Sequence, residues 1–176
     1  TRPIRMVTQF AAGSGGDALT RVFNEPLSTL LGQPVVIENR AGAGGVQAAE
    51  AIARAAPDGY TFGALTPNIP VIRVVAGTKI SIDPTKELVP MTAVGTTPSL
   101  IVVNPAVPIR TLKELLDYTK KNPNKLSFGT SGIGSAHHLA YEEMRLLTGI
   151  EMVHVPYKAG SQALIDVVTG QIPVGF

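Results

Sequence analysis

Short apolar runs alternate with amphipathic stretches along the whole chain, and this alternation limits the fold more than any other feature. Strands are predicted at residues 4–10, 34–38, 61–65, 100–103, 126–129, 152–155 and 172–176. Helices are predicted at residues 16–31, 46–54, 111–120, 135–148 and 161–169. Because such alternation is typical of βαβ units, the pattern predicts an α/β fold built on largely parallel sheets.

Several of the predicted helix ends have a chemical cause. Gly32 and Pro34 stop the first helix, and Thr111 is a candidate N-cap with Glu114 three residues further on. Pro26 does not fit the pattern, because a proline inside a helix lacks the N–H for one hydrogen bond. We therefore expect Pro26 to kink or divide the first helix.

The chain is predicted to form two lobes. Between residues 67 and 98 the helical period fades and prolines recur, and a second βαβ series begins near residue 99. We therefore expect a first lobe at 1–98 and a second at 99–176. The last predicted strand, at 172–176, looks only just begun, so we expect the second lobe to be incomplete in this chain.

Composition excludes several classes of protein. Fifteen Lys and Arg against 13 Asp and Glu are scattered along the 176 residues, so no nucleic-acid-binding stripe is expected. The absence of cysteine excludes disulfides, thiolate catalysis and cysteine-based zinc sites, and it is compatible with oxidising and reducing compartments alike. No apolar run is long enough to span a bilayer, and any signal peptide is expected to have been removed or left out.

Two loops share one plan, a strand followed by glycine and hydroxyl residues and then by a helix. The first is QFAAGSGGD at residues 9–17, and the second is GTSGIGSAHHL at residues 129–139. Backbone N–H groups at a helix N-terminus favour an anion, so the pair predicts a site that holds a small anion from two sides. A third loop, RAGAGG at residues 40–45, is interpreted first as a helix cap.

A dinucleotide-dependent enzyme is the alternative hypothesis. Residues 13–18 fit a relaxed G-x-G-x-x-A pattern, and Glu38 ends the next predicted strand, where a ribose-binding acid is expected. Ala11 and Ala12 weaken this match, since they separate the strand from the first glycine. The alternative therefore depends on the loop from Gly13 to Gly16 together with Glu38.

Other catalytic chemistry finds little support. Ile133 stands where a serine hydrolase elbow needs its last glycine. His137 and His138 are adjacent on a predicted helix, so they cannot form the i, i+4 pair of a zinc helix, and His154 is interpreted as a satisfied strand histidine. We expect no enzyme activity, no catalytic residue, no metal site and no cofactor.

The chain resembles the periplasmic solute-binding proteins of tripartite tricarboxylate transporters, the Bug family. The segments that carry the resemblance are PIR at 3–5, FAAGSGGD at 10–17, LGQPVVIENRAGAGG at 31–45, APDGYT at 56–61, GTSGIGS at 129–135 and HVPYK at 154–158. They follow one order over nearly the whole chain. The resemblance implies a two-lobed α/β protein of the type II periplasmic-binding-protein kind, which captures a small carboxylated solute between its lobes and delivers it to a membrane permease.

The resemblance also implies site residues. The first loop would contribute Phe10, Ala12, Gly13, Gly16 and Asp17, and the second Thr130, Ser131, Gly134, Ser135 and His137. Thr66, at the end of the third strand, is a weaker candidate. Asp17 either complements the helix dipole or accepts a hydrogen bond from a ligand ammonium or hydroxyl group.

The chain departs from the family at three places. The first loop reads AAGSGGD where proline-rich versions are common, Ala41 stands where proline is usual, and family members continue well past Phe176. These departures leave the solute open among dicarboxylates, amino acids, aromatic acids and nicotinate-like compounds. A shortened second lobe would expose apolar surface, so the chain is also expected to associate with itself.

Overall fold

The computed structural model describes residues 2–71, 80–96 and 98–176. The chain divides into two compact units, Thr1–Thr92 and Ala93–Phe176. The predicted connecting region at 67–98 includes residues 72–79 and 97, which lie outside the described residues. Each unit has its own sheet and is described by itself.

The first unit is a three-stranded parallel sheet flanked by helices. The elements are β1 (Ile4–Thr8), α1 (Gly15–Leu31), β2 (Val35–Asn39), the 3-10 turn η1 (Ala43–Gly45), α2 (Val46–Ala53), β3 (Thr61–Ala64) and the short α4 (Pro84–Glu87). The strand order is β2-β1-β3, and β1 is parallel to both neighbours. The predicted βαβ arrangement is therefore confirmed, and the loops that follow the strands meet at one edge.

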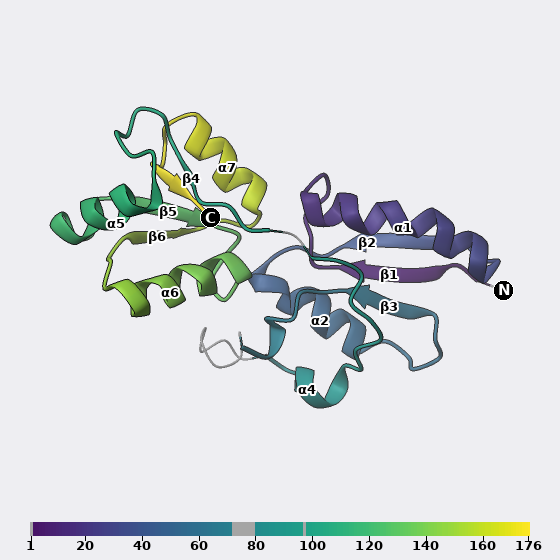
Figure 1. Ribbon diagram of the computed structural model, residues 1–176. Helices are drawn as coiled ribbons and strands as arrows, with labels where there is room; N and C mark the ends of the chain where they lie inside the picture. The colour runs from purple at the N-terminus through teal and green to yellow at the C-terminus, as the bar shows by residue number, and fades with distance from the viewer. Residues whose placement is uncertain (1, 72–79, 97) are drawn as a thin grey trace. The chain divides into compact units, whose positions relative to one another are not determined.

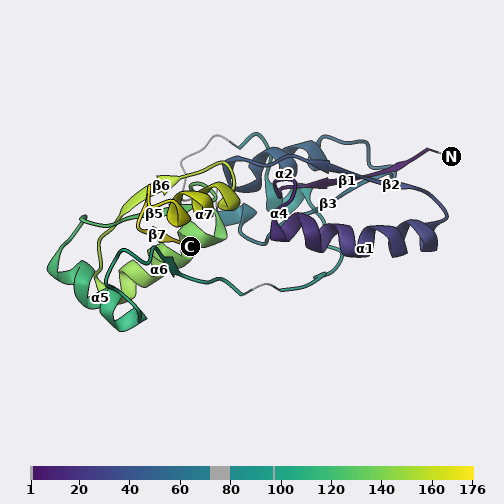
Figure 2. The ribbon, with the colours of Figure 1, turned by 90° about the horizontal axis from the view of Figure 1, so that it is seen from above.

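The two faces of this sheet are covered by different helices. Ile4 and Met6 point to one face, where they share a core cluster with Phe23 and Leu27 of α1. The other face is covered by α2, and Figures 1 and 2 show α1 and α2 on opposite sides of the strands. The alternation of side chains along β1 thus gives both helices an apolar surface to pack on.

Pro26 does not divide the first helix. Helix α1 runs from Gly15 to Leu31 with Pro26 inside it, and Gly32 closes it in the left-handed conformation at φ 63°. A proline removes one helical hydrogen bond, whereas the buried contacts of Phe23 and Leu27 hold the helix on both sides of it. The expectation that Pro26 divides the helix was therefore wrong, whereas the alternative, a kink at Pro26, stays a prediction.

The second unit is a mixed four-stranded sheet. The elements are β4 (Val102–Val103), α5 (Leu112–Lys121), β5 (Ser127–Thr130), α6 (Ala136–Thr148), β6 (Val153–Pro156), α7 (Gly160–Val168) and β7 (Val174–Gly175). The strand order is β4-β7-β5-β6, in which β5 is parallel to β6 and β7. The strand β4 pairs antiparallel with β7, so the sheet is largely rather than wholly parallel.

The core of the second unit surrounds Phe128 of β5, which is fully buried. Leu115 of α5 and Tyr141 of α6 belong to the same cluster, while α7 packs against β5 and β7. Figures 1 and 2 show α7 on the face of the sheet away from α6. Helix α5 begins with the predicted cap, because Thr111 and Glu114 form a reciprocal capping box.

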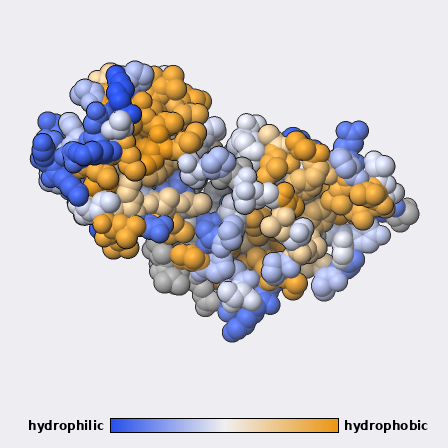
Figure 3. Space-filling model, in the orientation of Figure 1, coloured by the Kyte–Doolittle hydropathy of each residue, from blue (hydrophilic) through white to orange (hydrophobic). Residues whose placement is uncertain are grey.

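Helix α7 also presents apolar side chains to solvent. Leu164, Ile165 and Val168 are 49%, 54% and 72% exposed. Figure 3 shows the hydrophobic surface that gathers over this helix. Among the described residues, no helix is both long and apolar enough to cross a bilayer.

Candidate functional site

The two glycine-rich loops both follow the carboxyl end of a strand in a parallel pair. We keep the names first loop for residues 9–17 and second loop for residues 129–139. The first connects β1 to α1, and the second connects β5 to α6. In open α/β sheets, ligands bind beyond the carboxyl ends of the strands, so both loops lie where such a fold places its sites.

The first loop is organised by its N-cap and by the third residue of the helix. Ser14 caps α1, since its Oγ accepts a hydrogen bond from the N–H of Asp17 at 3.4 Å. Asp17 reaches back in turn, and its Oδ2 accepts from the N–H of Gly13 at 2.9 Å. Gly13 has a φ of 77°, a conformation that side chains other than glycine rarely adopt. The two bonds together hold the loop against the helix.

Asp17 is buried and bonded on every side. Arg21 Nε donates to its Oδ2 at 2.8 Å, and Asn39 Nδ2 donates to its Oδ1 at 2.8 Å. The hydrogen bond from Arg21 is the largest cause that lowers the pKa of Asp17, to about 2; burial opposes this shift, and the bonds from Asn39 and Gly13 add to it. Asp17 is therefore charged at neutral pH and fixes the loop, whereas a contact with ligand stays a prediction.

Asn39 ties this loop to the neighbouring strand. Its Nδ2 donates to the carbonyl oxygen of Phe10 at 2.9 Å as well as to Asp17. Asn39 lies opposite Thr8 in the register of β2 against β1, which brings it beside the loop. Sequence reasoning did not single out Asn39, and its position at the end of β2 is the signal that could have found it.

Thr66 is brought to the same edge by Gln9. Gln9 Nε2 donates to Thr66 Oγ1 at 2.7 Å, and the N–H of Thr66 donates to Gln9 Oε1 at 2.9 Å. The hydroxyl of Thr66 donates to Asn68, whose Nδ2 lies 3.5 Å from the carbonyl oxygen of Gly44 in the third loop. Side-chain amides therefore join the ends of β1 and β3 to the third loop.

Position 16 requires a glycine, because the ring of Phe10 packs against it. A Cβ on Gly16 would lie 2.2 to 2.5 Å from ring atoms of Phe10, so the ring occupies the space over this glycine. At Gly15 a Cβ would meet nothing within 4 Å. The structure thus gives Gly16 a packing reason, and the open side of the helix end lies at Gly15.

Two backbone donors remain available at the start of α1. Within the described residues, the N–H groups of Gly15 and Gly16 donate to no protein acceptor. The first N–H groups of any helix lack a partner within the helix, and they carry the positive end of its dipole. The first loop therefore presents donors suited to an anion.

The second loop repeats this plan with different chemistry. Ser135 caps α6 and accepts from the N–H of His138 at 3.2 Å, as Ser14 does from Asp17. His138 reaches back, and its Nδ1 accepts from the N–H of Gly134 at 3.1 Å. Gly134 has a φ of 76°, nearly equal to that of Gly13. An imidazole thus takes the place that a carboxylate has in the first loop.

Thr130 and His154 support the start of the second loop. Thr130 Oγ1 accepts from the N–H of Gly132 at 3.1 Å and lies 2.7 Å from His154 Nε2. Burial is the largest cause that lowers the pKa of His154, to about 4, and the nearby His138 adds to it. His154 is therefore neutral at pH 7, and the interpretation of a satisfied strand histidine is consistent with this bond.

The remaining predicted residues of the second loop also come together. Ser131 Oγ lies 3.3 Å from Nδ1 of His137, whose pKa burial lowers. The N–H groups of Ala136 and His137, the first two of α6, donate to no protein acceptor among the described residues. Each loop therefore presents two available N–H groups at the end of a helix.

In the structure, Glu38 forms ion pairs with two arginines, where the dinucleotide hypothesis requires it to bind a ribose. Its carboxylate accepts from Arg5 Nη2 at 2.8 Å and from Arg40 Nε at 2.5 Å. The bond from Arg40 is the largest cause that lowers the pKa of Glu38, followed by the bond from Arg5. The acid that the dinucleotide hypothesis needs is thus occupied by two arginines.

Comparison with known proteins gives several relatives. The chain is 38% identical over 171 residues to a UPF0065 protein encoded in the gbd 5′ region of Cupriavidus necator, and the match covers 97% of the chain and 52% of that relative. It is 36% identical over 172 residues to protein BugT of Bordetella pertussis, which covers 97% of the chain and 53% of BugT. The chain therefore spans about half the length of these curated relatives.

Solved structures with the same fold include periplasmic binding proteins. A Rhodopseudomonas palustris protein solved with adipate is 33% identical, has a TM-score of 0.91 and covers 99% of this chain, which spans 58% of its length. MatC of the same organism, solved with malate, is 29% identical with a TM-score of 0.87, covering 99% of this chain and 59% of its own. The periplasmic binding protein BugD is 31% identical with a TM-score of 0.83, covering 98% and 57%.

The model of the tripartite tricarboxylate transporter family receptor matches residues 19–175, which is most of the chain. The match includes β2 and β3 of the first sheet, all four strands of the second sheet and all of the second loop, whereas β1 and the first loop precede it. The matching family model is that of a transporter receptor, and BugD is a periplasmic binding protein, so the dinucleotide-enzyme hypothesis is not supported. The chain belongs to the tripartite tricarboxylate transporter receptor family.

Proposed function

We propose that this chain is the solute-recognising part of an extracytoplasmic receptor, and that it binds a small carboxylate. The observation that carries the proposal is the pair of matched loops, each with two available N–H groups at a helix N-terminus. The ligands of its structural neighbours, adipate and malate, support a carboxylate as the solute.

The chemistry of the loops sets how the carboxylate is recognised. Neither loop contains Lys or Arg, so binding depends on backbone N–H groups, hydroxyls and bridging water. A helix N-terminus favours a negative charge by about 0.3–1 kcal/mol when exposed, and by about 2 kcal/mol when partly buried. Such donors recognise the carboxylate rather than what is attached to it. We therefore propose a class of solute, the small carboxylates, and no individual compound.

The candidate ligand contacts are the residues that the sequence predicted, and among them the N–H groups of Gly13 and Gly134 already donate to Asp17 and His138. In the first loop they are the backbone of Ala12, Gly13 and Gly16, beside the ring of Phe10, with Thr66 and Asp17 behind them. In the second loop they are Ser131 and His137, the backbone of Gly134, and the supporting hydroxyls of Thr130 and Ser135. The charge of Asp17 is already neutralised by Arg21, so it does not repel a bound anion.

Family membership supports the place and partner of such a receptor. The protein would work in the periplasm and pass its solute to the membrane subunits of a tripartite tricarboxylate-type transporter. Self-association of this chain remains part of the proposal, and the exposed apolar side chains of α7 favour it. A stable monomer in light scattering would contradict self-association.

A thermal-shift screen tests the binding function. The chain is heated with mono-, di- and tricarboxylates, adipate and malate among them, with NAD and ATP as controls. A ligand that binds only the folded state raises stability by about 2.7 kcal/mol at a hundredfold excess over its dissociation constant. The proposal expects a shift with at least one carboxylate and none with the nucleotides, whereas a shift with a nucleotide alone would contradict it.

A further inference from the structure

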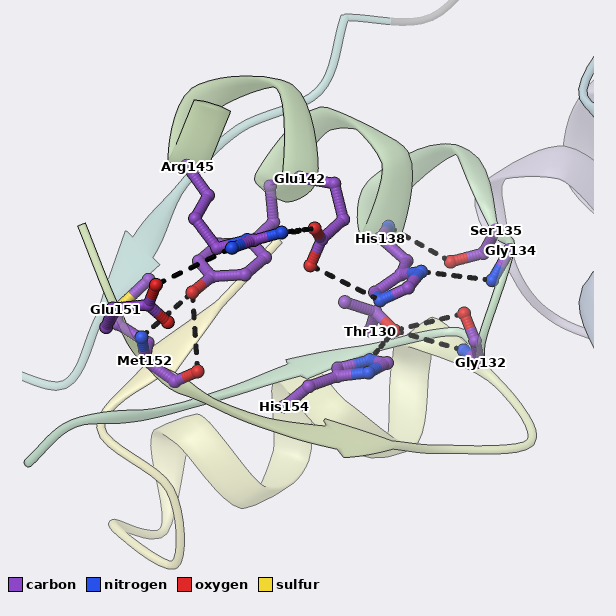
Figure 4. Close-up of polar contacts among 11 residues, drawn as sticks. Thr130, Gly132, Gly134, Ser135, His138, Glu142, Arg145, Glu151, Met152 and His154 are labelled. Atoms are coloured by element: carbon purple, nitrogen blue, oxygen red, sulfur yellow. Dashed lines mark hydrogen bonds and ion pairs between the residues drawn. The ribbon is translucent and has the colours of Figure 1, made fainter. Parts of the chain in front are cut away.

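His138 lies at one end of a stack of rings beneath the second loop. The ring centroids of His138 and His154 are 4.3 Å apart with an interplanar angle of 18°. His154 stacks in turn on Phe128, and Phe128 contacts Tyr141. Figure 4 shows the imidazole of His138, from α6, facing that of His154, from β6. The stack fixes the orientation of the His138 ring.

The hydrogen bond to Gly134 fixes which nitrogen of His138 carries the proton. Because Nδ1 accepts from the N–H of Gly134, the neutral ring carries its proton on Nε2. Nε2 lies 3.9 Å from Glu142 Oε1, and Arg145 is paired with the same carboxylate. Among the described residues, the hydrogen bond of the ring to the second loop is therefore made by Nδ1.

The equivalent position in the first loop indicates what this bond does. Asp17 is the third residue of α1, as His138 is of α6, and each side chain accepts from the N–H of a glycine four residues earlier. The bond fixes the turn that aims the next N–H groups. In the second loop these are the N–H groups of Ala136 and His137.

We propose that His138 is a positioning residue for solute binding, whose neutral Nδ1 holds the second loop in its binding conformation and whose protonation releases that loop. This inference rests on the carboxylate-binding function proposed above. An imidazolium has a proton on both nitrogens, so it cannot accept from Gly134, and the two N–H groups would repel. The carboxylate of Asp17 keeps its acceptor over the same range of pH.

The charged and titratable groups around His138 set the sign of this effect. Burial is the largest cause that lowers its pKa, and the Glu142 carboxylate on the same helix acts in the opposite direction. From β6, His154 faces the ring, and a charge on both imidazoles is unfavourable. Arg145 pairs with Glu142 and with Glu151. Release therefore occurs below the ordinary pKa of histidine, 6.5.

Two variants separate the acceptor from the packing of the ring. His138→Asn keeps an acceptor atom near the place of Nδ1 and does not titrate, but it loses the stack. His138→Phe keeps a ring against His154 and has no acceptor. At pH 7.5 we expect His138→Phe to bind adipate about tenfold more weakly than the wild type and His138→Asn to bind within about threefold. Equal loss in both, or normal binding in His138→Phe, would overturn the proposal.

The dependence on pH gives a second comparison. Between pH 7.5 and 4.5, the adipate affinity of the wild type should fall more steeply than that of His138→Asn, and the protonation of adipate itself is common to both. Equal slopes would contradict the proposal. Tyr141→Phe is the stability control, since it removes the bonds of the Tyr141 hydroxyl to Met152 without touching the loop, and it should leave affinity within about twofold.

A measurement without ligand keeps this inference separate from the proposed function. In ¹⁵N-labelled protein, a scalar coupling across the bond between the Gly134 nitrogen and His138 Nδ1 should be present at pH 7.5 and vanish in acid. If adipate and malate fail to bind the wild type while the coupling titrates, the proposed carboxylate function is contradicted. The proposed control of the second loop by His138 protonation would then still hold. A missing coupling at pH 7.5 would contradict the proposed control of the second loop by His138.

Discussion

The first and second loops have the same backbone arrangement, but different side chains accept the hydrogen bond from the glycine N–H. Each has a glycine at a φ near 77°, a serine N-cap and a third helical residue that reaches back to the glycine N–H. In the first loop the acceptor is the carboxylate of Asp17, which is paired with Arg21 and Asn39. In the second it is the neutral imidazole of His138, stacked on His154. The same backbone geometry therefore depends on a charged carboxylate in the first loop and on an uncharged imidazole in the second.

The difference separates the pH ranges in which the two loops hold together. The folded pKa of Asp17, about 2, is below its ordinary value of 3.8, so its contribution is present above pH 3.8 and is lost as the pH falls towards 2. The folded pKa of His154, about 4, is below its ordinary 6.5, so its contribution is complete above pH 6.5 and is lost as the pH falls towards 4. The second loop should therefore fail first in acid.

The largest expected effect on stability comes from removing the buried carboxylate of Asp17. Asp17→Ala should lower the free energy of unfolding by about 2–4 kcal/mol, because Asn39 Nδ2 and the N–H of Gly13 would lose their buried acceptor. Urea unfolding followed by circular dichroism measures the change. The matched control is Asp117→Ala, at an exposed aspartate paired with Lys113, which should leave the free energy of unfolding nearly unchanged. Equal effects at both positions would contradict a structural role for Asp17.

A smaller effect is expected from crowding the first loop. Gly16→Ala should cost about 1–3 kcal/mol, since its Cβ would collide with the Phe10 ring. Gly15→Ala is the matched control and should be nearly neutral. In a Phe10→Ala background the cost of Gly16→Ala should shrink, which a double-mutant cycle by thermal unfolding would measure. Additive costs would mean that Phe10 is not the cause.

The pH ranges can be compared within one molecule. As the pH falls from 7 to 4.5, amide exchange at Gly132 and Gly134 should become faster relative to the intrinsic rate, while Gly13 stays protected by the charged Asp17. Hydrogen exchange followed by NMR measures both loops in the same sample. Simultaneous loss of protection in both loops would remove the proposed distinction.

The smallest effect is expected at Glu38. Glu38→Ala removes an exposed pair of contacts with Arg5 and Arg40, so stability should change by about 0–1 kcal/mol and carboxylate binding should persist. Calorimetric titration with adipate checks the affinity. A dinucleotide enzyme would depend on this acid, and loss of ligand affinity in Glu38→Ala would revive that hypothesis.

The sequence was sufficient to predict the βα alternation and the place of both loops. The helix cap at Thr111 depends on residues close in sequence, and glycines mark the turns, so local chemistry predicts them, whereas the cap at Ser14 was not singled out. The short α4 was missed, because one turn inside a proline-rich segment has no period to detect.

The groups that hold the loops were harder to predict, because strand register places them. Asn39 reaches Asp17 only since it lies opposite Thr8 in the β1–β2 pair, and His154 reaches Thr130 from its place opposite Phe128. Register is not visible in one sequence without a template. His138 could have been found by aligning the two loops, in which it occupies the position of Asp17.

The most direct test of the account is an amide NMR titration of the chain with adipate. The account predicts that the amide signals of Gly15 and Gly16 in the first loop, and of Ala136 and His137 in the second, shift with one saturating dependence on adipate concentration. Saturable shifts confined to other residues, the surface around Arg5 and Arg40 for example, would contradict the claim that the helix ends bind the carboxylate.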